Sequence, residues 1–489
     1  MTSIAITKGV VDTPIYLQMV NRHGLIAGAT GTGKTVTLKV LTEKLSKEGI
    51  PVFLADIKGD LSGLAKAGQW TPKLEERYKL IGITDPFEPQ AFPVRLWDVF
   101  GRAGHPVRAT VEGMGSLFLS RLLDLNETQT GILAIVFKLA KEKEWPLIDL
   151  KDLQSLLKEV YEHSSEYSAH YGNITKQSVG AIQRSLLVLE EEGADQFFGE
   201  PALDLNDFMQ LDASGRGYIN ILSATKLFHS PKLYSTFLIW MLSRLFETLP
   251  EVGDPEKPKL VFFFDEAHLL FKDASKLFLE KVEQVVRLIR SKGVGIYFIT
   301  QNPQDLPESV LAQLGNRIQH ALRAYTPKEM KAIKVAAQSF RPNPDFDTET
   351  VITELGTGEA LVSFLNEKGQ PSVVERTFIL SPQSSFDLLN ESEQLALITT
   401  SPFHQKYATA IDRESAYEKL AAKASKEVQE EKKEAEKERS TTEKTEQKRN
   451  PGRPRKSSLE KAKDSFLSSL FRTIAREIAK LIMGSFKQK

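Results

Sequence analysis

"HGLIAGATGTGKTVTLKV", from His23 to Val40, joins an apolar run, a glycine-rich loop and a helical pattern without interruption. Gly28, Gly33, Lys34 and Thr35 fit the spacing G-x-x-x-x-G-K-S/T, and Gly31 makes the loop still more permissive. Glycines let successive backbone N–H groups turn inward around a phosphate at a helix N-terminus, where the helix dipole adds attraction. The stretch therefore predicts a phosphate-binding loop, in preference to a glycine-rich turn that binds nothing.

Each part of this loop has an expected role toward ATP and Mg²⁺. The Lys34 ammonium would reach the β- and γ-phosphates as a mobile charge, and the Thr35 hydroxyl would be a Mg²⁺ ligand. The residues predicted to bind nucleotide are Gly28, Ala29, Thr30, Gly31, Thr32, Gly33, Lys34 and Thr35.

A second strand-like run, "KLVFFFDEAH", ends in two carboxylates, Asp265 and Glu266. Carboxylates that end a buried strand are costly unless they meet a cation and water. Asp265 is therefore predicted to hold Mg²⁺ and Glu266 to polarise the attacking water. For Asp265 alone, capping of a helix is the alternative. His268 is more typical of a packing or capping group than of a catalyst.

A third run, "GVGIYFITQNPQDLP", ends in Thr300 and Gln301. Ligands of parallel sheets lie at the carboxyl ends of the strands, so Gln301 is predicted to sense the γ-phosphate or to orient water. A turn-forming role before Asn-Pro is the alternative. Asp56 also ends a strand, in "FLADIKGD", and with Lys58 and Asp60 is expected to line the same cleft at most indirectly.

The order of patterns predicts an α/β fold with a mostly parallel sheet. Strand and helix alternate from Leu25 to about Trp97, amphipathic helices follow to about Asn206, and strand-like runs return up to Leu380. The predicted divisions are residues 1–100 and 206–380 as the two parts of the core, 101–205 as a helical insertion, 381–450 as a linker and charged segment, and 451–489 as a basic motif with an amphipathic helix.

Composition narrows the class of protein. The 489 residues contain 64 basic and 64 acidic side chains, so the overall charge indicates no polyanionic partner. The chain has no cysteine, which excludes disulfides, thiolate zinc sites and cysteine nucleophiles. The start "MTSIAITKGV" does not resemble a signal peptide, and no apolar run is long enough to span a membrane. A cytoplasmic protein is expected.

The last segment differs from the rest in charge. Residues 414–450 are rich in Lys and Glu and are predicted to be a solvated helix or disordered. "PGRPRK" then resembles the core of an AT-hook, although a basic hinge is an equally good interpretation. The following amphipathic helix is basic, and three functions stay open for it: packing in an oligomer or on a partner, lying on an anionic membrane surface, or contacting DNA.

Four motifs in this order resemble the HerA/FtsK superfamily of ring-forming ATPases. They are "GATGTGKT", "DIKGDLSGLA", "VFFFDEAHLLF" and "ITQNPQDLPESVLAQLGNRIQHALRAYTPKE". Within that superfamily, the chain is similar to a bacterial family with a helicase HerA-like C-terminal domain, over roughly residues 5–380 and again in the tail. The "DEAH" letters alone would suggest a superfamily 2 helicase, but the other motifs of that class do not occur in this sequence.

The resemblance implies a RecA-like P-loop core that assembles into a hexamer, hydrolyses ATP between subunits and often moves double-stranded DNA. It also implies an arginine supplied by a neighbouring subunit, for which Arg323 is favoured and Arg317 is the second candidate; for each, an ordinary structural arginine is the alternative. Few residues precede Gly28, so the N-terminal barrel of HerA helicases, and with it a nuclease-docking role, is not expected.

The sequence thus predicts a Mg²⁺-dependent ATPase of HerA-like type, a ring-forming DNA translocase or helicase-like motor. The alternative is an ATP-dependent oligomeric switch or scaffold that serves a protein or membrane partner without moving DNA.

Overall fold

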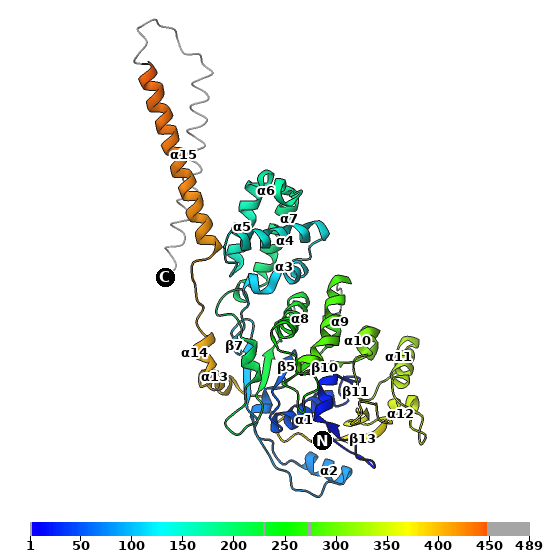
Figure 1. Ribbon diagram of the computed structural model, residues 1–489. Coiled ribbons are helices and arrows are strands. Elements are labelled where there is room, and N and C mark those ends of the chain that lie inside the picture. Colours follow the sequence, from blue (N-terminus) through cyan, green and yellow to red (C-terminus); the bar gives the residue numbers. More distant parts are fainter. Residues whose placement is uncertain (1, 228–229, 272–275, 447–489) are drawn as a thin grey trace. The chain divides into compact units, whose positions relative to one another are not determined.

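The computed structural model describes residues 2–227, 230–271 and 276–446 (Figure 1). The chain divides into two compact units, and the first ends at Leu420. The first unit is built on an 11-stranded sheet. The described part of the second unit belongs to helix α15 (Ala416–Glu446), so this stretch of the Lys- and Glu-rich segment is helical. The predicted basic motif and amphipathic helix at 451–489 lie outside the described residues.

The large sheet is parallel through most of its width. Its strand order is β2-β13-β12-β11-β4-β10-β9-β5-β8-β6-β7. All neighbours from β11 to β7 are parallel, and the pairs β11/β12, β12/β13 and β13/β2 are antiparallel. The strands are β2 (Thr7–Lys8), β4 (Gly24–Ala27), β5 (Val52–Asp56), β6 (Val94–Asp98), β7 (His105–Pro106), β8 (Ile219–Ser223), β9 (Leu260–Phe264), β10 (Val294–Thr300), β11 (Asn316–Gln319), β12 (Glu359–Ser363) and β13 (Glu375–Ile379); β1 (Ser3–Ile4) and β3 (Ile15–Tyr16) pair separately. The predicted fold class is confirmed.

The central strands are apolar because both of their faces are covered. Leu25 and Ala27 of β4 belong to one hydrophobic core, whereas Ile26 between them belongs to a second core on the opposite face. The same alternation places Phe262 and Phe264 of β9 on the first face and Phe263 on the second. Such continuous apolar strands are typical of parallel sheets with helices on both faces.

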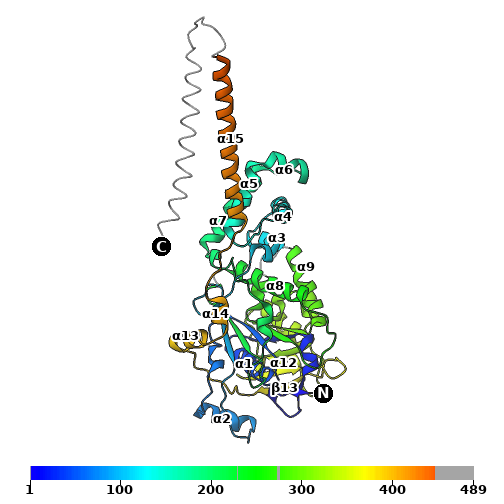
Figure 2. The same ribbon diagram turned by 60° about the vertical axis from the view of Figure 1, so that its left-hand side comes forward.

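Helix α1 (Lys34–Lys47) covers one face, and α8 (Pro231–Thr248) covers the other, since each helix shares a core with that face. Five helices cluster next to α8, as Figures 1 and 2 show: α3 (Val111–Leu122), α4 (Glu127–Glu142), α5 (Leu150–Glu162), α6 (Ser164–Tyr171) and α7 (Lys176–Glu191). They fall where the helical insertion is predicted; its boundaries stay a prediction. The indole Nε1 of Trp240 in α8 donates to the carbonyl of Gly113 at 2.8 Å, which ties this cluster to the core.

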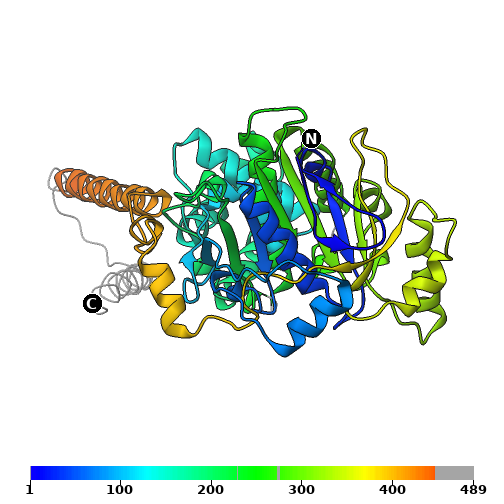
Figure 3. The same cartoon turned by 90° about the horizontal axis from the view of Figure 1, so that it is seen from below.

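The remaining α-helices of the first unit lie at several points along the chain. They are α2 (Pro72–Ile81), α9 (Lys276–Leu288), α10 (Glu308–Leu311), α11 (Pro327–Gln338), α12 (Thr348–Glu354), α13 (Glu391–Thr399) and α14 (Phe403–Tyr407). In Figure 3, which views the face that carries α1, the chain after β13 runs past α1 toward α13. Within residues 2–227, 230–271 and 276–446, no helix has both the length and the apolar composition needed to cross a bilayer.

One strand is shorter than its sequence pattern predicts. The run "RIQHALRAY" suggests a strand up to Tyr325, but β11 ends at Gln319. The next residue, His320, still donates its backbone N–H to the Ala27 carbonyl at 2.7 Å, and its ring lies against Thr37 of α1. The strand order then places the carboxyl ends of β11, β4, β10, β9 and β5 side by side, which is the edge where a parallel sheet binds its ligands.

Candidate active site

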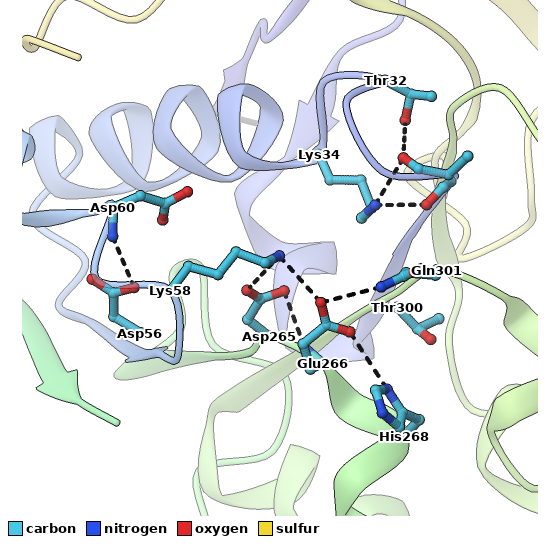
Figure 4. Close-up of polar contacts among 12 residues, drawn as sticks. Thr32, Lys34, Asp56, Lys58, Asp60, Asp265, Glu266, His268, Thr300 and Gln301 are labelled. Atoms are coloured by element: carbon cyan, nitrogen blue, oxygen red, sulfur yellow. Dashed lines mark hydrogen bonds and ion pairs between the residues drawn. The ribbon is translucent and has the colours of Figure 1, made fainter. Parts of the chain in front are cut away.

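The glycine-rich loop connects β4 to α1, as the sequence predicts. Gly28, Gly31 and Gly33 have φ values of 154°, 77° and 120°, a region that favours glycine. The Lys34 ammonium donates to the carbonyl oxygens of Gly28 at 2.6 Å and Ala29 at 3.0 Å (Figure 4). The Thr32 hydroxyl donates to the Ala29 carbonyl at 2.7 Å. The lysine is thus inside the curve of the loop, at the start of the helix.

Close packing on the β11 side explains why the loop begins with glycine. A Cβ at Gly28 would lie 2.5 Å from the Cβ of His320. The His320 ring is buried, with Nε2 2.8 Å from the Thr37 hydroxyl and Nδ1 2.9 Å from the Glu359 carbonyl. Because a carbonyl only accepts, Nδ1 carries the ring proton, and burial lowers the pKa of His320 to about 4, so the ring is neutral. Sequence reasoning missed this residue, which it placed inside a strand.

The two carboxylates at the end of β9 lie together beside Lys58. The Lys58 ammonium is 3.2 Å from Asp265 Oδ2 and 3.2 Å from Glu266 Oε1. The carboxylate side chains are 13% and 9% exposed. Burial raises the pKa of Asp265 while Lys58 opposes that rise. Conversely, burial disfavours the charge on Lys58, but the two carboxylates outweigh it and raise the pKa of Lys58.

Asp56 builds the loop that presents Lys58. Its carboxylate accepts backbone N–H groups of Gly59 at 2.7 Å, Asp60 at 3.2 Å and Leu61 at 3.1 Å. Burial raises the pKa of Asp56 to about 6, although these donors stabilise the charged form. The indirect role expected for Asp56 fits this geometry, whereas Lys58 lies in the centre of the site (Figure 4). In the sequence, the position of Lys58 just after the end of a strand was the one sign that it could reach the site.

The two carboxylate oxygens of Glu266 have different partners. Its backbone adopts φ 48° and ψ 49°, an unusual left-handed conformation for a residue other than glycine. Gln301 Nε2 lies 3.5 Å from Oε1, and His268 Nδ1 lies 3.4 Å from Oε2. Within the described part of the chain, Oε2 is buried and accepts no hydrogen bond. The structure thus brings Glu266 and Gln301 together, and it places His268 beside them.

The two candidate arginines differ in how they are held. The Arg317 guanidinium donates to three backbone carbonyls, those of Leu314, Ser339 and Leu311, at 3.0–3.1 Å. Burial lowers its pKa. Arg323 is exposed and donates to the carbonyls of Thr353 and Leu355 at the end of α12. Among the described residues, the carboxylates of Asp265 and Glu266 form ion pairs with Lys58 and His268 and with neither arginine, and the role of either arginine toward a neighbouring subunit stays a prediction.

The residues present fit a magnesium–nucleotide complex. Burial lowers the pKa of Lys34, and the nearby Lys58 lowers it further, so an added polyanion would relieve the repulsion between the two ammonium groups. Glu266 Oε2, which accepts no hydrogen bond from the described residues, could accept one from a water. Among the described residues, no group of three or more His, Asp or Glu forms a protein-only metal site. Mg²⁺ that binds together with a nucleotide would need only one or two protein ligands beside the phosphate oxygens. Thr35 and Asp265 would be those ligands.

A mostly parallel sheet, a phosphate loop on its central strand and a carboxylate pair two strands away define a RecA-like P-loop fold. Among solved structures, the chain is similar to plasmid coupling protein TrwB in complex with the ATP analogue ADPNP, with a TM-score of 0.50, 15% sequence identity, and coverage of 78% of this chain and 91% of that chain. That similarity concerns the fold alone.

The family follows from the sequence match. The family described as "Helicase HerA-like C-terminal" matches residues 4–489, and the chain belongs to it. Among curated proteins, the chain is 24% identical over 357 residues to the DNA double-strand break repair helicase HerA of Saccharolobus solfataricus, covering 72% of this chain and 63% of that protein. It is 22% identical over 377 residues to the HerA of Sulfolobus acidocaldarius, covering 72% and 64%. The chain thus spans less than two thirds of the length of these relatives.

Proposed function

We propose that the protein is a Mg²⁺-dependent ATPase. The observation that carries this proposal is the buried Glu266 carboxylate, whose Oε2 accepts no hydrogen bond from the described residues; it lies next to Asp265 and at the same sheet edge as the glycine-rich loop. Backbone N–H groups of residues 28–33 would bind the phosphates, and Lys34 would neutralise the β- and γ-phosphates. When bound through Thr35 and Asp265, Mg²⁺ would polarise the phosphates. Glu266 would orient and deprotonate the attacking water, and Gln301, which contacts Glu266, would sense the γ-phosphate.

We further propose that a neighbouring subunit completes the site with Arg323. Arg317 is less suitable. To reach a neighbouring subunit it would have to give up hydrogen bonds to three carbonyls, and its partly buried guanidinium would lose these acceptors. Arg323 can leave two carbonyls at low cost because it is exposed. An arginine in trans requires at least two subunits, and a hexameric ring is the assembly that the family resemblance favours.

A mixing experiment tests the shared site. Arg323→Ala subunits keep their own phosphate loop, and Lys34→Ala subunits keep their arginine. Mixing the two inactive variants should restore part of the ATPase activity, because some interfaces then combine an intact loop with an intact arginine. Absence of any recovery in mixtures that co-assemble would contradict the trans assignment, and full activity of a monomer would contradict the ring.

We propose that ATP hydrolysis drives translocation of the protein on double-stranded DNA. Support comes from the family and from relatives that are named helicases. Stimulation of ATP hydrolysis by double-stranded DNA, measured at several salt concentrations, is the direct test, because phosphate contacts weaken steeply with salt. Displacement of a third strand from a triplex would then distinguish movement along DNA from binding alone.

One observation favours the alternative, a nucleotide-dependent oligomeric scaffold for a protein partner. Residues 101–205, which contain helices α3 to α7, carry more acidic than basic side chains. A segment with negative net charge repels the DNA backbone and suits a protein partner better. ATP hydrolysis that double-stranded DNA leaves unchanged at low salt would support this alternative and contradict the motor.

A further inference from the structure

A second feature of the site lies on the other side of the phosphate loop from the carboxylates. It is a cavity of about 480 Å³. Gly33 of the loop and Val36 of α1 form one wall, and Gly358, which precedes β12, forms another. Phe87 and Phe386 contribute aromatic surface. The volume is within the range of small-molecule sites, roughly 300–1,000 Å³.

The strand order gives the direction in which a bound nucleotide would extend. Asp265 and Glu266 follow β9, which lies on one side of the loop strand β4, beyond β10. Gly358 lies toward the opposite side, beyond β11, and its N–H donates to the Thr32 carbonyl of the loop at 3.0 Å. A nucleotide whose terminal phosphate faces Glu266 therefore leaves the loop near Gly33 and Val36, where the cavity opens.

The cavity wall is fixed to the same helix that begins at the phosphate loop. On α1, the buried Glu43 carboxylate accepts the backbone N–H groups of Gln383 at 2.8 Å and Ser384 at 3.0 Å, and also the Ser384 hydroxyl at 2.6 Å. The buried Lys39 ammonium donates to the Ser385 carbonyl. Burial raises the pKa of Glu43 and lowers that of Lys39 to about 8. Two buried charges thus hold residues 383–385 against α1, directly before Phe386.

Phe386 is the exposed aromatic residue of this wall. Its side chain is 63% exposed, and the Lys39 ammonium lies 5.0 Å from the ring centroid. An aromatic face left open beside a phosphate site is suited to a nucleobase, since every base has a π-face that can stack. Arg77 lines the same cavity, but its guanidinium already donates hydrogen bonds to the carbonyls of Gly358 at 2.7 Å and Ile379 at 3.0 Å.

We propose that this cavity receives the base and ribose of the nucleotide bound at the phosphate loop, and that Phe386 stacks on the base. The inference rests on the proposed ATPase function. It assigns recognition of the nucleoside to the segment after β13 and to the segment around Phe87, separately from recognition of the phosphates.

The experiment compares two ligands that share the phosphate part. Binding of ATP and of inorganic tripolyphosphate, each with Mg²⁺, is measured by calorimetry for the full chain and for Phe386→Ala. The variant should bind ATP about tenfold more weakly, because it lacks the stacking ring, and should bind tripolyphosphate within about twofold of the unchanged chain. Phe386→Tyr, which keeps the ring, should restore ATP binding. Leu388→Ala removes another exposed apolar side chain of the same segment and should change neither affinity.

The outcomes separate this inference from the proposed function. If the unchanged chain binds ATP and Phe386→Ala binds it equally well, or loses both ligands to the same extent, the base site is refuted while the ATPase proposal stands. If the unchanged chain binds neither ligand, both proposals fail. Lys34→Ala should weaken both ligands, since it removes a charge that both would contact.

Discussion

Replacing Lys58 by methionine removes the cation beside Asp265 and Glu266 while keeping the length of the side chain. Each ammonium–carboxylate distance is 3.2 Å. Coulomb attraction at that distance is about 5 kcal/mol per pair for an effective dielectric constant of about 20. Water screens this value because the Lys58 side chain is 42% exposed, and exposed pairs contribute only about 0.2–1 kcal/mol.

The carboxylates are much less exposed than the lysine, so leaving them unpaired costs more than at an open surface. The expected effect therefore lies between that of an exposed pair and the full Coulomb value. Lys58→Met should lower the free energy of unfolding at neutral pH by roughly 1–3 kcal/mol. The loss should depend on pH. Burial already raises the pKa of Asp265, and without Lys58 that pKa rises further. The penalty is therefore complete above the raised pKa and disappears as the pH falls and the carboxyl takes up a proton.

Urea unfolding of both proteins at several values between about pH 4 and pH 8 measures this difference. The matched control is Lys257→Met, since Lys257 pairs with Glu48 at 3.1 Å and is 43% exposed. That exposed pair should change stability by less than about 1 kcal/mol. A Lys58→Met penalty that is constant across the pH range, or no larger than that of the control, would refute the electrostatic account of the site.

Three further changes test the supports of the site. Arg317→Ala should lower the free energy of unfolding by about 2–3 kcal/mol, because three carbonyls lose their donor; urea unfolding with no change would show that the arginine is free to move. Asp56 has a pKa raised to about 6, so its stabilising contribution is complete at low pH and is lost as the pH rises through 6. Asp56→Asn should therefore flatten the pH dependence of stability between about pH 4 and 6, and an unaltered profile would contradict the raised pKa. Gly28→Ala should abolish ATP binding, because the new Cβ would lie 2.5 Å from that of His320; normal affinity in a binding titration would show that the loop is less constrained.

Local sequence patterns were sufficient to predict the parallel sheet and one part of the site. The strand-loop-helix unit of β4 and α1 and the apolar run of β9 each follow from residues adjacent in sequence. Because polar residues at the ends of parallel strands meet at one edge, Asp265, Glu266 and Gln301 could be grouped before the structure was known.

The other parts of the site depend on contacts between distant segments. Lys58 reaches the carboxylates because Asp56 folds its loop around three backbone donors, and nothing in the local pattern specifies that direction. Lys39 and Glu43 resemble ordinary polar positions of a helix, yet both are buried by residues more than 300 positions later in the chain. The sequence pattern places His320 within a strand, yet its ring contacts Thr37, a distant residue that no local pattern could pair with it.

ATP turnover by Lys34→Ala and Glu266→Gln tests the central claim most directly. The account predicts that Lys34→Ala loses nucleotide binding. Glu266→Gln should still bind ATP but should hydrolyse it roughly 10²- to 10⁴-fold more slowly, because the group that accepts the proton from water is gone. Hydrolysis at the unchanged rate in both variants would contradict the account.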